Sequence, residues 1–179
     1  MKPKILLSLS LVLSVELVGC STATNHGNST VGDNPTGFPL RYCNSEYGLT
    51  FFLPESWRGY SIVTGQWEAE AYSPVADKLV AADHGPMIVF RNPKCKTSDP
   101  HQDIPVLMFT RSQWDAFHDG KLGSLYAGGV IYEMWHNDKY VFGIYSRYNA
   151  NDSVKGWDEA AAILTRNCAA NEAGHLYAQ

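Results

Sequence analysis

The sequence predicts an α+β fold in which helices cover an antiparallel β-sheet, and three observations lead to this prediction. Runs of strand-forming residues recur between residues 47 and 147, with turn-forming residues between them. Only two segments, residues 110–120 and 153–167, show the spacing of an amphipathic helix. The chain has 179 residues, of which 45% are hydrophobic, and this is enough for one independent core.

The first pair of strands is expected just after the folded region begins, near residue 41. Apolar side chains occupy every second position from Tyr47 to Leu53, and Pro54 ends this run. A turn follows, and a second strand covers at least residues 60–64, so the two strands should pair as an antiparallel hairpin. Residues 68–84 have a mixed pattern, in which residues 74–82 fit either a short helix or a surface loop.

Two continuous apolar runs, residues 86–90 and 104–109, predict the buried centre of the sheet. Pro105 lacks an amide hydrogen, so it should lie at the start of its strand or face a gap in the hydrogen-bond ladder. The loop between the two runs, residues 91–103, is long, polar and rich in proline. Loops of this kind often carry function.

The first helix has a clear start signal. Thr110 and Gln113 have the spacing of a capping box, in which each side chain bonds the backbone of the other. Trp114 and Phe117 then fall on one face, and Gly120 ends the segment. The helix is therefore expected to pack by its aromatic face.

A hairpin and a second helix complete the predicted fold. Residues 130–135 and 139–147 read as two strands, because residues 136–138 have the composition of a hairpin turn. Within residues 153–167 and just beyond, apolar residues recur at helical spacing. This expected packing stripe consists of Trp157, Ala161, Leu164 and Cys168.

The first nineteen residues have the pattern of an export signal. Two lysines precede an apolar run of roughly eleven residues, which is far too short to span a ~30 Å hydrocarbon core. Residues 17–20, Leu-Val-Gly-Cys, resemble the bacterial lipobox, although Glu16 places a charge where an apolar residue is usual. We therefore expect lipid on Cys20, which would hold the chain stably on a membrane. The alternative is an ordinary secretory signal with an incidental cysteine.

The export signal and the amino-acid composition together predict how the chain is divided into parts. Residues 21–39 are mainly Ser, Thr, Asn, Gly and Pro, as in a flexible linker. Cleavage before Cys20 removes two lysines and one glutamate from the totals of 14 basic and 18 acidic side chains, leaving 12 and 17. This mild acidity argues against nucleic acid as a partner. The predicted parts are a signal peptide at 1–19, a tether at 20–40, one domain at 41–168 and a disordered tail at 169–179.

Three cysteines remain if Cys20 carries lipid. Disulfides form readily in exported proteins, and the ends of a domain often lie close together. The predicted pair is therefore Cys43 with Cys168. Cys95 would then be left over, either as an incidental thiol or, because Lys94 and Lys96 favour its thiolate, as a redox-sensitive one.

Three stretches resemble a family of small uncharacterised bacterial proteins: YGLTFFLPESWRGY at residues 47–60, QDIPV at 102–106 with Phe109-Thr110, and KYVF at 139–142 with Arg147-Tyr148-Asn149. The first stretch and the order of the elements are also similar to the PsbP and Mog1 superfamily. That resemblance implies an α/β/α sandwich. Cys95 departs from the aromatic residue expected at its position, and the resemblance implies no activity and no site residue.

Catalytic and cofactor motifs are missing from the sequence. There is no Gly-x-Ser-x-Gly elbow, no phosphate-binding loop and no dinucleotide fingerprint. The six histidines form no compact zinc pattern, so no metal and no cofactor are predicted. The most suggestive polar set is a possible binding loop, because a histidine near carboxylates can act as a general base. It consists of Asp99, His101, Gln102 and Asp103; the alternative is that these side chains fix the loop and start the next strand.

The leading interpretation of function is a non-enzymatic envelope module that is anchored by lipid and binds another envelope protein. A second interpretation is a small-molecule or lipid site between sheet and helices, lined by some of the five tryptophans. The third is a hydrolase, which requires His101 and Asp103 to converge with another polar group. The expected location is the bacterial cell envelope, and Ser21 resembles the outer-membrane sorting pattern of Gram-negative lipoproteins. Oligomeric state stays open.

Overall fold

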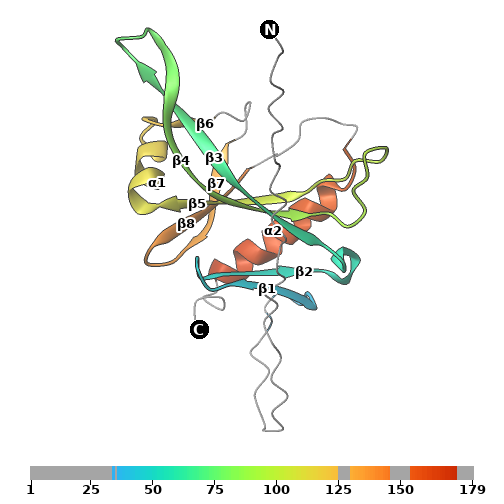
Figure 1. Ribbon diagram of the computed structural model, residues 1–179. Coiled ribbons are helices and arrows are strands. Elements are labelled where there is room, and N and C mark those ends of the chain that lie inside the picture. Colours follow the sequence, from blue (N-terminus) through green and yellow to red (C-terminus); the bar gives the residue numbers. More distant parts are fainter. Residues whose placement is uncertain (1–33, 35, 125–129, 146–153, 173–179) are drawn as a thin grey trace, which may run out of the picture.

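The computed structural model describes residue 34 and residues 36–124, 130–145 and 154–172 of the chain. Its elements are β1 Leu40–Asn44, β2 Leu49–Leu53, the 3-10 helix η1 Glu55–Trp57, β3 Ser61–Ser73, β4 Lys78–Arg91, β5 Ile104–Thr110, α1 Arg111–His118, β6 Gly123–Ser124, β7 Ile131–His136, β8 Tyr140–Tyr145 and α2 Trp157–Glu172. Six strands form one antiparallel sheet in the order β6-β3-β4-β5-β8-β7, and β1 and β2 form a separate ribbon (Figure 1). The α+β prediction is confirmed.

The two helices cover opposite faces of the sheet. In β5, Met108 packs in the same cluster as Ile163 of α2, whereas Phe109 packs in the same cluster as Trp114 of α1. Because successive side chains of a strand point to opposite faces, α1 and α2 lie on different sides. The β1-β2 ribbon shares the face of α2, where Phe51 belongs to the same cluster as Met108.

The predicted centre of the sheet is confirmed. Residues 104–109 are all buried in β5, and residues 104–107 pair with residues 87–90 of β4. Pro105 is the second residue of its strand and lies opposite Val89. These two strands occupy the middle of the sheet because both of their faces are covered.

The predicted pairing of the first two strands is wrong. β2 pairs with β1, a strand that the sequence pattern did not reveal, and β3 pairs with β4. The ribbon packs face-on against the sheet, so that Phe51 stacks on Phe90 with ring centroids 4.4 Å apart. The other edge of β2 is occupied by the Asn167 side chain, which bonds the backbone N–H and C=O of Phe52. β2 therefore has no edge left for β3.

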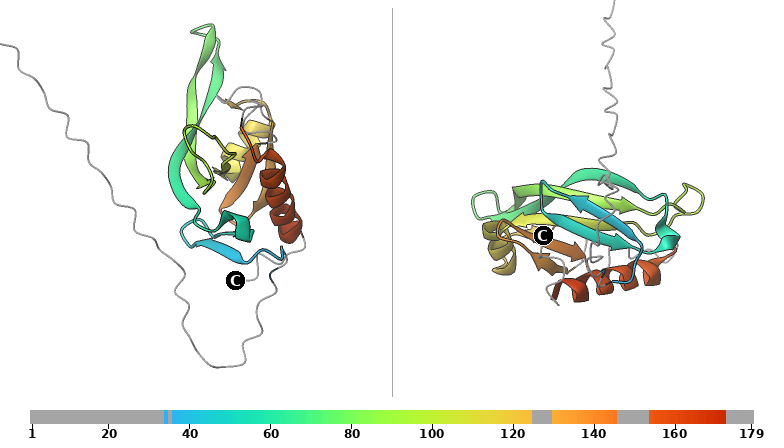
Figure 2. Two further views of the ribbon diagram at one scale, coloured as in Figure 1. Left: turned by 90° about the vertical axis from the view of Figure 1, so that its right-hand side faces the viewer. Right: turned by 90° about the horizontal axis from the view of Figure 1, so that it is seen from below.

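Residues 74–82, expected to form a short helix or a surface loop, form the turn at 74–77 and the first residues of β4. The whole mixed segment, residues 68–84, belongs to a long hairpin in which β3 and β4 are paired from Ser61 and Arg91 to Ser73 and Lys78, with only residues 74–77 in the turn. The hairpin projects beyond the rest of the sheet (Figures 1 and 2). Cross-strand pairing, with one register shift between Ala69 and Glu70, here overrides the weak strand preference of the alanine-rich sequence.

The predicted start of the first helix and the predicted second hairpin are confirmed. The capping box at Thr110 and Gln113 is complete, and Trp114 is buried on the packing face of α1. β7 and β8 form the predicted antiparallel hairpin. Asn137 closes the turn of that hairpin, since its Oδ1 accepts hydrogen bonds from the amides of Lys139 and Tyr140 at 2.9 and 2.8 Å.

Helix α2 differs from the prediction in its bounds and in which of its stripes is fully buried, although Leu164 and Cys168 of the predicted stripe do pack against the core. It runs from Trp157 to Glu172 rather than over residues 153–167. The side chains of α2 that enter the core are Ala160, Ile163, Asn167 and Ala170. The stripe expected to pack there is only partly buried and consists of Trp157, Ala161, Leu164 and Cys168. Two stripes thus have helical spacing, and the tertiary contacts decide which one is fully buried.

The packed domain also extends past both expected ends. Thr36 is buried, and its carbonyl accepts a hydrogen bond from Arg166 at 3.1 Å. The same guanidinium lies over the Phe38 ring, 5.0 Å from its centroid. Ala170 is buried as well. Parts of the expected tether, residues 20–40, and of the expected tail, residues 169–179, therefore belong to the domain.

Candidate functional site

The polar residues proposed from the sequence lie in the loop between β4 and β5 and do not form one site. Nε2 of His101 is 3.4 Å from a carboxylate oxygen of Asp99. The Asp103 carboxylate instead accepts hydrogen bonds from the Asn92 amide at 2.8 Å and from Arg91 Nε at 3.3 Å. His101 and Asp103 thus bind different partners, and the geometry does not favour the hydrolase interpretation.

Asp99 connects this loop to the residues that precede α2. Nζ of Lys155 lies 2.7 Å from the second carboxylate oxygen of Asp99. The backbones also meet, because the Gln102 N–H donates to the Lys155 carbonyl at 2.7 Å and the Lys155 N–H donates to the Pro100 carbonyl at 3.1 Å. The hydrogen bond from Lys155 is the main cause that lowers the pKa of Asp99, and His101 adds to it.

Gln102 and Asn92 hold the loop from inside. Both side chains are buried. Nε2 of Gln102 donates to the Asp103 carbonyl at 3.0 Å, and Nδ2 of Asn92 donates to the Gln102 carbonyl at 3.3 Å. Oδ1 of Asn92 accepts from the Lys94 amide at 2.9 Å. These contacts favour the structural alternative, in which the side chains fix the loop and start β5.

Replacing Asp99 by asparagine is expected to loosen this connection without unfolding the domain, because the ion pair with Lys155 is exposed. Amide hydrogen exchange at Gln102 and Lys155 should become faster at neutral pH. The folded pKa of Asp99 is lowered, so the pair is present above the ordinary pKa of the carboxyl group and is lost as pH falls through the lowered value. At pH values below the lowered pKa of Asp99, the amides of Gln102 and Lys155 should exchange at the same rate in wild type and in Asp99→Asn. Unchanged exchange at neutral pH would contradict the prediction, and Asp115→Asn on α1 is the control.

The predicted lipidation site and the predicted disulfide involve three cysteines, Cys20, Cys43 and Cys168. Cys20 lies outside the described residues. Cys43 in β1 and Cys168 in α2 are both partly buried, and no disulfide is formed within the described ranges, so their pairing stays a prediction. In the same ranges, no group of three His, Cys, Asp or Glu side chains is placed to hold a metal ion. None of the described helices is both long and apolar enough to cross a bilayer.

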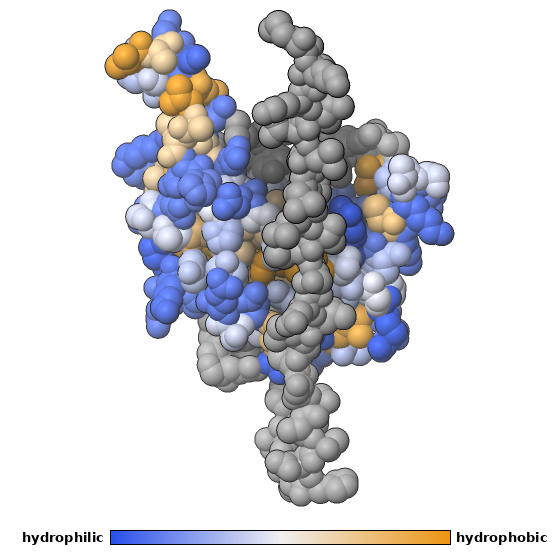
Figure 3. All heavy atoms as spheres, viewed as in Figure 1, coloured by the Kyte–Doolittle hydropathy of each residue, from blue (hydrophilic) through white to orange (hydrophobic). Residues whose placement is uncertain are grey.

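The end of the β3-β4 hairpin is a site that the sequence did not indicate. We call residues 71–80 the hairpin tip. Tyr72 is 59% exposed, Leu79 opposite it is 57% exposed, and Val75 in the turn is 99% exposed. β6 pairs with β3 only at Ala69 and Glu70, so beyond these residues no other described strand covers the hairpin. Figure 3 shows the apolar tip standing out from a largely hydrophilic surface.

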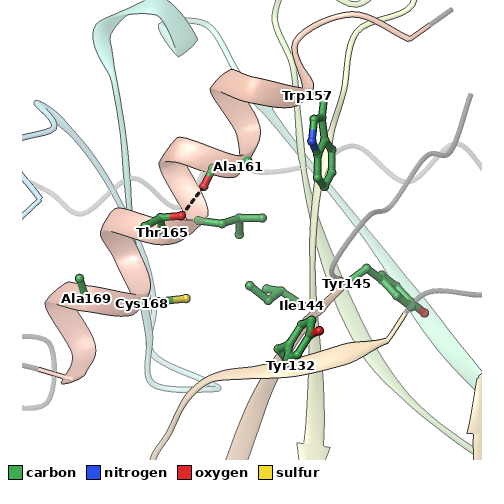
Figure 4. Close-up of a pocket in the computed structure, with 9 residues that line it drawn as sticks. Tyr132, Ile144, Tyr145, Trp157, Ala161, Thr165, Cys168 and Ala169 are labelled. Atoms are coloured by element: carbon green, nitrogen blue, oxygen red, sulfur yellow. Dashed lines mark hydrogen bonds between the residues drawn. The ribbon is translucent and has the colours of Figure 1, made fainter. Parts of the chain in front are cut away.

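A second candidate site is a groove between α2 and the strands β7 and β8. Its volume is about 440 Å³. Figure 4 shows Trp157 and Cys168 projecting from α2 toward Ile144 and Tyr132 of the sheet, while the Tyr145 ring points away. We call this cavity the α2 groove; it is lined by Tyr132, Ile144, Tyr145, Trp157, Ala161, Leu164, Thr165, Cys168 and Ala169.

In the sequence, the residues of both sites have the pattern of ordinary structural residues, and none of them by itself gives a sign of a binding role. Tyr72 and Leu79 are typical strand residues, and the stripe that begins at Trp157 is typical of a buried helix face. The one sequence signal for the groove was the presence of two apolar stripes on α2, which is one more than a helix on a sheet needs. The hairpin tip gave no such signal.

Comparison with known proteins supplies no relative. No family model, curated protein or solved structure matches this chain. The resemblance to a small bacterial family and to the PsbP and Mog1 superfamily therefore stays a prediction. Function has to be proposed from the two surfaces themselves.

Proposed function

We propose that this protein is a non-enzymatic binding module of the bacterial cell envelope. Lipid on Cys20 would hold it at the membrane, and the hairpin tip would dock on another envelope protein. The location rests on the lipobox-like residues 17–20. The observation that carries the proposed function is the exposure of Tyr72, Val75 and Leu79 at the end of a projecting hairpin.

The energetics of the hairpin support a role in binding. A two-stranded ribbon gains little stability in water unless one of its faces is packed. Beyond Glu70 this ribbon has no described neighbouring strand, yet it keeps large apolar side chains on its surface. Exposed apolar clusters with polar surroundings are typical of interaction sites. The tip therefore fits an apolar recess in a partner.

The charges near the tip indicate the kind of partner. Residues 68–84 carry four acidic side chains, Glu68, Glu70, Asp77 and Asp83, against the single basic residue Lys78. Complementary charge speeds and orients association, so the partner recess should have lysine or arginine at its rim. The same acidic residues disfavour insertion of the tip into an anionic lipid surface. A basic, apolar recess on a protein is the better complement.

The experiment is site-specific photocrosslinking in the native envelope. A benzoyl-phenylalanine in place of Val75 should give one discrete adduct with another protein, because this side chain is 99% exposed at the outermost turn. The same amino acid in place of Asp115, which is exposed on α1, should give none. Mass spectrometry of the adduct would identify the partner and its basic residues.

A double substitution provides the specificity control. Tyr72→Ser with Leu79→Ser should abolish the adduct, while the thermal midpoint changes little because both side chains are exposed. Equal adducts from positions 75 and 115, no adduct from position 75, or an adduct that survives the double substitution would each refute the proposed docking surface.

A further inference from the structure

The α2 groove exists because small side chains occupy the helix face opposite β7 and β8. Ala161 lies between Trp157 and Leu164 along this face, and Ala169 follows Cys168 at its far end. The core stripe that contains Ile163 already fixes the helix against the sheet. Leu164 and Cys168 of the neighbouring stripe pack only partly against the core, and the rest of their surface lines the groove. Figure 4 shows this space between the α2 residues Ala161 and Cys168 on one side and Ile144 on the other.

The shape of the groove is long and narrow. Its lining runs along α2 from Trp157 to Ala169, a length of about 18 Å at a rise of 1.5 Å per residue. The volume of about 440 Å³ falls within the range of small-molecule sites. A volume of this size spread over more than three helical turns suits an extended chain better than a compact ring system.

The lining is uncharged. None of its nine residues has a carboxylate, an ammonium, a guanidinium or an imidazole group. The Thr165 hydroxyl donates a hydrogen bond to the Ala161 carbonyl at 2.9 Å, so its hydrogen is already used within the helix. Burying a charged group here would leave it without an opposite charge, which is strongly unfavourable. The complement of this lining is a neutral aliphatic molecule.

We propose that the α2 groove binds an uncharged single-chain amphiphile, with its alkyl chain lying along α2 between Trp157 and Ala169. The chain displaces water from Leu164 and Ile144 and packs against the Trp157 indole, which gives the usual gain from burying apolar surface. The polar head lies toward solvent beside the exposed Thr165 and Ala169. This inference is independent of the hairpin tip and of the protein partner proposed above.

The test uses 1-monolauroylglycerol as the probe and the mature chain, residues 20–179, with Cys20→Ala so that no lipid or detergent competes. Native mass spectrometry should show a one-to-one complex. Trp157 offers an independent signal, because the other four tryptophans are buried and Trp157 is partly exposed. Acrylamide quenching of the tryptophan fluorescence should decrease when the probe binds. No complex at probe concentrations below micelle formation would overturn the proposal.

Two adjacent alanines give a matched pair of variants. Ala161→Phe places a ring inside the groove and should weaken binding at least about tenfold, since it fills the space that the chain needs. Ala162→Phe makes the same change on the exposed face of α2 and should leave binding unchanged. Ala169→Phe blocks the exposed far end of the groove and serves as a second block if Ala161→Phe impairs folding. Equal binding by wild type and both blocked variants would overturn the proposal.

The hairpin variant separates this inference from the proposed function. Tyr72→Ser with Leu79→Ser should bind the probe as wild type does, because the hairpin tip and the α2 groove share no residue. Loss of probe binding in that variant would place the probe on the hairpin tip and overturn the groove assignment. Photocrosslinking at Val75 is unaffected by Ala161→Phe if the two sites are independent.

Discussion

Replacing Asn167 by leucine is expected to lower the free energy of unfolding by about 3 kcal/mol. Asn167 is fully buried, and its Oδ1 accepts a hydrogen bond from the Phe52 amide at 2.9 Å. Its Nδ2 donates to the carbonyls of Phe52 and Ile163, both at 2.9 Å. Leucine has a similar volume but no polar atoms, so the Phe52 N–H and C=O would be left buried without partners. Urea denaturation followed by circular dichroism measures the change.

This prediction has a control in the same helix. Ala162→Leu introduces the same residue at an exposed position of α2 and should change the unfolding free energy by less than about 0.5 kcal/mol. A similarly small effect of Asn167→Leu would mean that the contact with Phe52 does not join the β1-β2 ribbon to α2. The expected loss would also confirm that a side chain, rather than a strand, closes the edge of β2.

Replacing Gly85 by alanine is expected to lower the free energy of unfolding by about 2 kcal/mol through overpacking. A Cβ atom at Gly85 would lie 2.5 Å from two carbon atoms of the Trp67 indole. The indole has little freedom to move, because it is buried, its Nε1 donates to the Met108 carbonyl at 2.8 Å, and it stacks on Phe109 with centroids 4.5 Å apart. The added methyl group therefore has to separate β3 from β4 or displace the ring.

The matched control lies on the neighbouring strand. A Cβ atom at Gly65 would approach only the terminal methyl of Met87, at 3.4 Å, and that flexible side chain can turn aside. Gly65→Ala should thus leave the unfolding free energy within about 0.5 kcal/mol of wild type. Thermal denaturation of both variants compares them directly. Equal losses at Gly85 and Gly65 would show that contact with the Trp67 ring is not what requires glycine.

Together, the two substitutions probe how the hairpin and the ribbon are attached to the core. Gly85 and Trp67 lie where the β3-β4 hairpin leaves the part of the sheet that α1 covers. Asn167 connects the ribbon to the helix that borders the α2 groove. Each candidate binding surface therefore rests on a rigid base, as a pre-organised recognition site requires.

Several elements could be predicted because their determinants are local. The apolar runs at residues 86–90 and 104–109, the capping box at Thr110 and the turn at Asn137 each depend on neighbours within a few positions. The structure confirms all of them. The export signal and Cys20 are likewise read from adjacent residues, and they lie outside the described part of the chain.

The candidate sites could not be predicted, because they depend on what distant segments leave uncovered. Tyr72 and Leu79 are indistinguishable in sequence from core residues of a strand, and they are exposed because the hairpin projects beyond the two core clusters (Figure 1). The polar loop residues His101 and Asp103 looked like a site, but the structure gives them separate partners. Their closeness in sequence therefore suggested a shared site, but their hydrogen-bond partners in the folded structure are different.

The sequence by itself determined the α+β class, the central strands and the start of α1, since these follow from periodicity and from capping over a few residues. Only the tertiary structure decided that β2 pairs with β1 and that residues 68–84 extend a hairpin. It also decided that the stripe with Ile163 is fully buried while the stripe with Leu164 is only partly buried. The physical reason is that equally apolar surfaces compete for burial. Contacts between distant residues, such as Asn167 with Phe52, select which surface is buried and which is left free to bind.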